Sequence, residues 1–165
     1  MNARAQMDDL VIRHAADSDS HALIALIGTV YAEYPGCVLD VKNELPELLT
    51  PAAAARAEGG RWWVAELGGK VVASASALPK DGAVELKRLY VNAASRKRGL
   101  GAHLVKLAEA EAHWRELPRV FLWTDTRFAD AHRLYEKLGY TRGSTRELND
   151  LSNSVEYHYA KELRR

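Results

Sequence analysis

The chain has 165 residues, which is near the usual size of one domain and short for two. Hydrophobic residues make up 47% and charged residues 27%, with a formal net charge of +1, and these values exclude a disordered tail, a collagen-like repeat and a disulfide-rich mini-protein. The single cysteine, Cys37, excludes an intrachain disulfide and a cysteine-based zinc site and favours a reducing compartment.

The first 60 residues predict one strand followed by two helical stretches. The short β-branched run Leu10 to Arg13 is typical of a strand. Asp17 or Ser18 is expected to cap a helix that runs to about Glu33, because apolar residues follow at helical spacing. A second, weaker helical pattern covers residues 45–57.

Three strands joined by tight turns are expected next. Strands over 62–67 and 71–75 are separated by Gly68-Gly69, which predicts a hairpin because both central residues can take positive φ. The segment 79–82 predicts a second turn of this kind. It leads into a third strand over 84–91.

The second half of the chain alternates helices and strands. We expect a helix from Leu100 that ends before Pro118, a strand over 120–123, a helix around 131–138, and closing strands over 140–146 and 155–160. The order β-α-α-β-β-β-α-β-α-β-β predicts an α/β (α+β) fold, in which helices flank one mixed, mostly antiparallel central sheet. No linker divides the chain, so 1–165 is expected to be a single domain with its core at about 10–163.

The segment Arg96-Lys97-Arg98-Gly99-Leu100-Gly101-Ala102 follows a strand and opens a helix. Unpaired N–H groups and the helix dipole favour an anion at such a start. The two glycines let a phosphate approach the backbone, and the three basic residues add positive charge. The pattern suits a pyrophosphate, although a flexible basic loop that enters a helix explains it equally well. It is neither a P-loop nor a dinucleotide fingerprint.

Two blocks of the sequence together resemble the GNAT superfamily of acyl-CoA-dependent N-acetyltransferases. Arg-x-x-Gly-x-Gly, after the strand over 84–91, is similar to the family's acetyl-CoA pyrophosphate loop, and Leu134-Tyr135-Glu136-Lys137-Leu138-Gly139-Tyr140 is similar to its Leu-Tyr-x-x-x-Gly-Phe/Tyr block. The strong similarity covers about 84–141. It implies an N-acetyltransferase that uses acetyl-CoA as cosubstrate and transfers the acetyl group by direct attack of a primary amine in a ternary complex. No metal is expected, because the six histidines show no metal-ligand spacing.

The resemblance also implies roles for individual residues. Leu89, Tyr90 and Val91 bind the pantetheine arm and the acetyl carbonyl through their backbone, in a strand that splays from its neighbour. Tyr135 is the general acid that protonates the departing thiolate, and Glu85 is placed as the general base. The residues expected at the pyrophosphate are Arg96, Lys97, Arg98, Gly99, Leu100, Gly101 and Ala102.

Acetyl transfer to an amine needs a general base and a general acid, the roles implied for Glu85 and Tyr135, but a purely structural role also explains each residue. A lysine-type amine has a pKa of about 10.4, so its neutral form costs roughly 4.6 kcal/mol at pH 7, and a carboxylate can remove the proton. Glu85 is equally well explained as an exposed strand residue paired with Lys87 or Arg88. Tyr135 lies on the apolar stripe of its helix, where tyrosines are usually core residues, and the resemblance is what favours the acid role.

One position departs from the family pattern, and the acceptor site is left open. Phe128 stands where the family often has a cofactor-binding Asn, and Thr124, Thr126 or Asp130 are the candidate substitutes. By analogy, the first two helices and the last strands build the acceptor pocket. Its aromatic candidates, each of which packing also explains, are Tyr31, Tyr34, Trp63, Tyr157 and Tyr159.

The charge is unevenly distributed along the chain. Residues 1–60 carry 4 basic and 9 acidic residues, whereas 61–165 carry 19 basic and 13 acidic residues. Chance segregation explains this too, but a basic half in a neutral chain suits a localised anion better than a nucleic acid, and the acidic part favours a cationic acceptor.

We therefore expect a small-molecule amine or peptide acceptor, no nucleic acid and no membrane partner, with a homodimer left open. No apolar stretch spans a bilayer and no secretory signal stands at Met1 to Asp9, so a cytoplasmic location is expected. The alternatives are a non-catalytic acyl-CoA sensor of the same fold and a nucleotide-phosphate binder that uses only residues 96–101.

Overall fold

The computed structural model describes residues 9–164, so the expectation for Met1 to Asp9 falls almost wholly outside it. The strands are β1 (Leu10–His14), β2 (Arg61–Leu67), β3 (Lys70–Lys80), β4 (Ala83–Val91), β5 (Arg119–Asp125), β6 (Thr141–Glu147) and β7 (Val155–Glu162). The α-helices are α2 (Ser20–Tyr31), α3 (Pro51–Ala57), α4 (Leu100–Trp114) and α5 (Ala129–Lys137), and short 3-10 helices are η1 (Asp17–Asp19), η2 (Pro46–Leu49) and η3 (Ala93–Ser95). The predicted order of strands and α-helices is confirmed.

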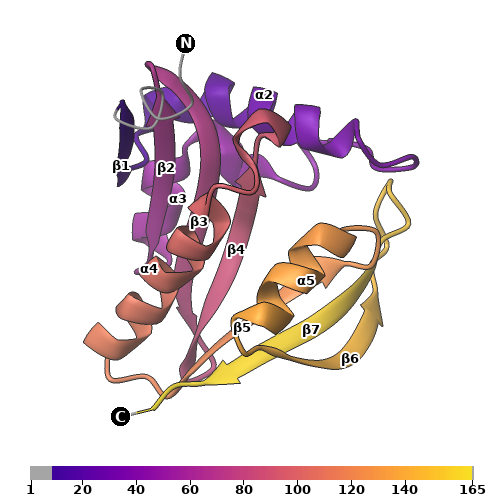
Figure 1. Cartoon of the computed structure of the whole chain (residues 1–165). Helices are drawn as coiled ribbons and strands as arrows, with labels where there is room; N and C mark the ends of the chain where they lie inside the picture. The colour runs from indigo at the N-terminus through magenta and orange to yellow at the C-terminus, as the bar shows by residue number, and fades with distance from the viewer. Residues whose placement is uncertain (1–8, 165) are drawn as a thin grey trace.

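One seven-stranded sheet organises the described chain, in the order β1-β2-β3-β4-β5-β7-β6. β4 and β5 are parallel and the other pairs are antiparallel, which confirms the mixed, mostly antiparallel sheet. α4 and α5 cover one face and α2 and α3 lie on the other (Figure 1). The figure also shows β4 and β5 diverging, so that β5, β7 and β6 swing away from the first four strands.

The turns between β2, β3 and β4 follow from residues that tolerate positive φ. Gly68 and Gly69 have φ of 58° and 79°, as the expected tight hairpin requires. The second turn is shorter than expected, because β3 continues to Lys80. Only Asp81 and Gly82, with φ of 52° and 72°, form it.

The N-terminus of α2 differs from the sequence prediction. The α-helix starts at Ser20, after the 3-10 turn η1, and it ends at Tyr31. Asp19 is the acidic residue that organises this start, because its carboxylate accepts the Ala16 N–H at 2.7 Å and pairs with Arg13 at 2.8 Å. The two ionic bonds to Arg13 fix Asp19 here in preference to Asp17 or Ser18.

Two apolar clusters hold the helices to the sheet. The larger lies between the sheet and α4 and α5, and the smaller lies under α2 and α3. Because α4 packs against the sheet from its first turn, Gly101 comes close to the end of β4: a Cβ at Gly101 would lie 3.8 Å from Val91 Cγ2. The fold therefore places the glycine-rich start of α4 beside the divergence of β4 and β5.

Candidate active site

The backbone of β4 leaves its parallel neighbour early. β4 and β5 pair only at Val84 with Val120 and at Glu85 with Phe121. Beyond Glu85 the two strands diverge, and a cavity of about 360 Å³ lies against the rest of β4. Leu89 and Tyr90 line it, so backbone groups on that edge of β4 are open to a ligand. This is the splay that the family resemblance implied.

A bulge in β4 shapes the near wall of this cavity. Tyr90 pairs with Ser74 and Lys87 pairs with Ser76, so Arg88 and Leu89 together lie opposite one residue of β3. Arg88 has a φ of 55°, a conformation that non-glycine residues rarely adopt and that is often found beside functional sites. Such a bulge bends the strand and redirects its side chains.

The start of α4, near the end of β4, has a geometry suited to an anion. Gly99 has a φ of 78° and precedes the first turn, and no side chain caps the helix. The side chains of Lys97 and Arg98 are exposed, and Gly99 faces open space. Free N–H groups, exposed cations and room for a phosphate therefore meet at one point. Leu100 is buried in the core, so only its backbone is available to a ligand.

Arg96 makes contacts that the sequence did not predict. Its Nη1 and Nη2 donate to both carboxylate oxygens of Glu33 at 2.6 Å, and its Nε donates to the carbonyl oxygen of Val91 at 3.0 Å. The side chain thus ties the loop to the end of α2 and to β4. In this geometry Arg96 holds the loop before α4 in place, and the side chains of Lys97 and Arg98 remain exposed.

Tyr135 is both a core residue and a cavity residue. It is 4% exposed, its ring lies 5.6 Å from that of Tyr159, and it lines the cavity. Burial raises the pKa of its hydroxyl, which therefore stays protonated at neutral pH. Among residues 9–164 no hydrogen-bond partner occupies that hydroxyl, so it is free to donate.

Glu85 is buried and lines the same cavity. Its Oε1 lies 3.8 Å from Lys80 Nζ, a loose contact with an exposed side chain, and Lys87 and Arg88 form no ion pair with it. The exposed-strand alternative is therefore wrong in its premise of exposure. A buried carboxylate with a weak partner on the cavity wall is suited to accept a proton.

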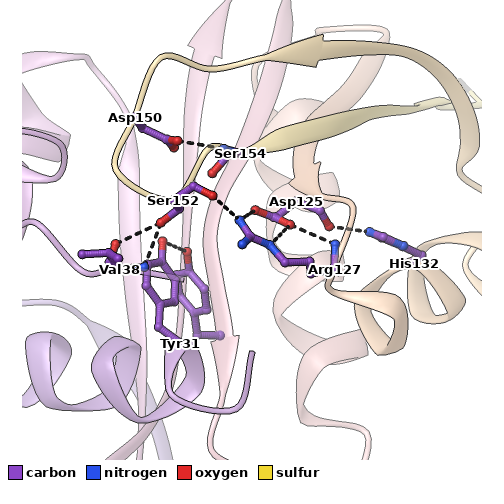
Figure 2. Close-up of polar contacts among 9 residues, drawn as sticks. Tyr31, Val38, Asp125, Arg127, His132, Asp150, Ser152 and Ser154 are labelled. Atoms are coloured by element: carbon purple, nitrogen blue, oxygen red, sulfur yellow. Dashed lines mark hydrogen bonds and ion pairs between the residues drawn. The ribbon is translucent and has the colours of Figure 1, made fainter. Parts of the chain in front are cut away.

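Away from β4 the cavity is lined by Val38, Asp125 and Ser152, and the bonds of Ser152 hold this far wall together (Figure 2). Ser152 Oγ accepts the Val38 N–H at 2.8 Å and donates to the Val38 carbonyl oxygen at 3.2 Å. Arg127 Nη2 donates to the Ser152 carbonyl oxygen at 3.1 Å. We call residues 148–154, which join β6 to β7 and here bond to the segment after α2, the strap.

Asp125 anchors this wall at the end of β5. Arg127 Nε and Nη2 donate to its two carboxylate oxygens at 2.9 and 2.7 Å. Burial acts to raise the pKa of Asp125, but the bonds from Arg127 outweigh it and lower the pKa, so the side chain is a carboxylate. His132 Nε2 lies 2.9 Å from the Asp125 carbonyl oxygen, which fixes α5 to the same strand end (Figure 2).

Few of the residues predicted for the acceptor pocket, or as substitutes for the family's Asn at position 128, line the cavity. Of the five aromatic candidates, only Tyr31 lines the cavity. Phe128 also lines the cavity, and its ring centroid lies 4.8 Å from that of Tyr34. Of the three candidate substitutes for the family's Asn, only Thr124 lines the cavity. Sequence reasoning missed Asp125 and Ser152 as cavity residues, because neither belongs to a motif.

Within residues 9–164, no group of three or more His, Cys, Asp or Glu side chains is arranged to hold a metal ion. None of the helices in that range combines the length and apolar character needed to cross a membrane.

Comparisons with known proteins agree with this geometry. The sequence matches the model of the acetyltransferase (GNAT) family over residues 23–140. It is 30% identical to the N-acetyltransferase YjgM of Escherichia coli (strain K12) over 136 residues, 79% of this chain and 81% of YjgM, and the activity of YjgM is itself uncharacterised.

Solved structures share the fold. A GNAT-family acetyltransferase from Staphylococcus aureus Mu50 superposes with a TM-score of 0.80 at 17% identity, covering 94% of this chain and 99% of the other. The yncA protein of Salmonella typhimurium, solved with its cofactor acetyl-CoA, gives a TM-score of 0.70 at 21% identity, covering 94% and 95%.

Proposed function

The chain belongs to the acetyltransferase (GNAT) family, and on that premise we propose that it transfers an acetyl group from acetyl-CoA to a primary amine of a small molecule or peptide. The observation that carries this proposal is the open edge of β4 beyond Glu85, which runs into the glycine-rich start of α4. We also propose that it works in the cytoplasm, as its single cysteine favours, whereas the homodimer stays a prediction.

The residues around the cavity fit acetyl-CoA. The pyrophosphate would lie at the N–H groups of Gly99 to Ala102, beside Lys97 and Arg98. The pantetheine arm would pair with the backbone of β4 at Leu89 to Val91, where β5 has moved away. Bound there, the cosubstrate supplies an activated acetyl thioester. A protein of similar fold was solved with acetyl-CoA, which supports acetyl-CoA as the cosubstrate proposed here.

Glu85 and Tyr135 can supply the two proton transfers of a direct attack. Both line the cavity against which the thioester would lie. Glu85 accepts the proton of the acceptor ammonium, directly or through water, and so produces the nucleophilic amine. As the C–S bond breaks, Tyr135, kept protonated by burial, donates its hydroxyl proton to the departing sulfur, and the proton lost from the newly bonded nitrogen restores the hydroxyl through water. The presence of both groups favours an enzyme over a non-catalytic acyl-CoA sensor.

Ligand-induced stabilisation and thiol release together test the proposal. A ligand that binds only the folded chain raises its melting temperature. Acetyl-CoA and CoA should therefore raise Tm far more than ATP or NAD, and a panel of amines and peptides should release CoA thiol from acetyl-CoA. An equal response to ATP would favour a nucleotide-phosphate binder. Stabilisation without thiol release from any acceptor would favour the sensor.

A further inference from the structure

We propose that the acceptor is a small molecule that carries a carboxylate as well as its amine, and that Arg88 binds that carboxylate. The proposal rests on the proposed acetyl transfer and names the substrate class for the same cavity. It assigns Arg88, which lies three residues beyond Glu85 on β4, to the recognition of the acceptor.

The bulge in β4 brings the Arg88 side chain to the cavity, where it is largely buried. Its Nε and Nη2 both donate to a single oxygen of Glu47, Oε1, at 2.8 and 2.5 Å. Its Nη1 has no hydrogen-bond partner within residues 9–164. Because a guanidinium offers five N–H donors in a planar fork, the edge that Glu47 leaves free can receive a second carboxylate.

Two tyrosines add neutral donors to the same wall. The hydroxyls of Tyr31 and Tyr90 lie 3.3 Å apart, and both residues line the cavity. One hydrogen joins the two oxygens, so the other remains for a ligand. Burial raises the pKa of Tyr31, which keeps its hydroxyl a donor at neutral pH.

The other arginines around the cavity are occupied by carboxylates of the chain. Arg127 donates to both oxygens of Asp125, and Arg146 donates to Glu156 at 2.8 Å. Lys87 also lines the cavity, and no carboxylate pairs with it within residues 9–164. Lys87 is thus the rival recognition group and the natural control, since it lies next to Arg88 on the same strand.

The strap favours a small acceptor over a polypeptide. Ser152 bonds to both backbone groups of Val38 (Figure 2). In addition, Leu151 N donates to the Glu44 carboxylate at 2.8 Å. These bonds hold the strap against the segment after α2, and Val38, Glu44 and Ser152 line the cavity of about 360 Å³. A long chain could pass between the strap and that segment only if these bonds broke. A free amine that also bears a carboxylate fits without that cost.

The test compares each L-amino acid with its own carboxamide as acceptors for acetyl-CoA, with thiol release as the readout. The wild-type enzyme should use the best amino acid with kcat/KM about 10- to 100-fold above that of its amide, since a charge-assisted bond to a buried group is lost on amidation. Arg88→Gln should remove this preference, mainly through KM, and Lys87→Gln should retain it. Where Arg88→Gln does not fold, the double variant Tyr31→Phe/Tyr90→Phe takes its place. It leaves the ion pair to Glu47 intact but removes both hydroxyl donors, so it should weaken the preference.

Equal use of acid and amide by the wild-type enzyme would overturn the proposal, and so would loss of the preference in Lys87→Gln alone. Turnover confined to amines without a carboxylate, or to peptides longer than the cavity, would also overturn it. If acetyl-CoA still raises Tm in these cases, only the acceptor assignment fails. Absence of both stabilisation and thiol release with every amine would overturn the proposed function, and this proposal with it.

Discussion

Single side chains decide whether the cavity is catalytic, and Glu85 is the first of them. Removing its charge in Glu85→Gln should lower turnover at pH 7 by about 10²–10⁴-fold, the usual range for loss of a general base. The deficit should shrink as the pH rises toward about 10, because neutral amine becomes abundant without a base.

Lys80 provides a matched control for the Glu85 variant, because in the described chain it is the only cationic residue within 4 Å of the Glu85 carboxylate. Lys80→Gln removes the 3.8 Å contact but leaves the carboxylate, so its pH–rate profile should follow that of the wild-type enzyme. A Glu85→Gln variant with an unchanged rate at pH 7 would show that Glu85 is structural.

Tyr135 offers a cleaner separation of catalysis from stability. Tyr135→Phe keeps the ring that packs beside Tyr140 and Tyr159, and the lost hydroxyl has no bonding partner within residues 9–164. We expect turnover to fall by about 10²-fold or more, with Tm and acetyl-CoA affinity nearly unchanged. Thiol-release kinetics and thermal unfolding measure the two quantities. Full activity in the variant would leave Tyr135 as a core residue.

At the scale of elements, the glycine at the second position of α4 supports packing as well as ligand approach. A Cβ on Gly101 would lie 3.0 Å from Leu134 Cδ2, on the helix that carries Tyr135. Gly101→Val should therefore destabilise the fold by about 1–3 kcal/mol, as overpacking of a core does, in addition to weakening acetyl-CoA binding.

A second-site variant tests that origin of the stability loss. Leu134→Ala provides the space that the valine needs, so the double variant Gly101→Val/Leu134→Ala should be more stable than the sum of the two single effects predicts. Urea unfolding of the four proteins gives the coupling. Strict additivity would mean that Leu134 does not limit the size of residue 101.

The elements that sequence reasoning found are those with local signals. Gly68-Gly69 fixes a hairpin within four residues, Gly139 ends α5 with a φ of 92°, and residues 96–102 carry the start of α4 in their own composition. The residue before α2 is Asp19, one or two residues after the predicted Asp17 or Ser18. The sequence pattern does not show this, because it depends on the ion pair between Asp19 and Arg13 on β1.

The parts of the site that the sequence did not reveal depend on distant contacts. Ser152 and Val38 are 114 residues apart, and nothing near either residue predicts their bond. The bulge at Arg88 arises from the register between β3 and β4, which an alternating strand pattern does not show. Motifs therefore located the start of α4 and Tyr135, whereas the cavity wall at Val38, Arg88 and Ser152 required the assembled fold.

At the scale of the whole molecule, the acidic first part of the chain and the basic remainder form ion pairs with each other. Glu33 pairs with Arg96 and Glu47 pairs with Arg88, so acidic residues of the first 60 hold basic residues of the remainder. These pairs fasten η2 to β4, and the segment just after α2 to the loop before α4. The excess of acid near the N-terminus is thus partly neutralised, which weakens it as an indication of a purely cationic acceptor.

Two histidines govern how the stability of the molecule responds to mild acid. Burial lowers the pKa of His132, on α5, and of His158, on β7, below the ordinary value of 6.5. As the pH falls, the unfolded chain takes up these protons before the folded chain does. The free energy of unfolding should therefore decrease from about pH 7 to pH 5 and level off once the folded histidines are also protonated.

Carboxyl groups do not produce this decrease. The fold lowers the pKa of Asp19 and Asp125, so their contribution to the free energy of unfolding is lost only near and below the ordinary pKa of 3.8. His132→Gln keeps an N–H donor for the Asp125 carbonyl oxygen but cannot titrate, so it should reduce the slope between pH 7 and 5. His158 should account for the slope that remains. Urea unfolding at half-unit pH steps measures both slopes, and identical slopes in the two proteins would contradict the assignment to His132.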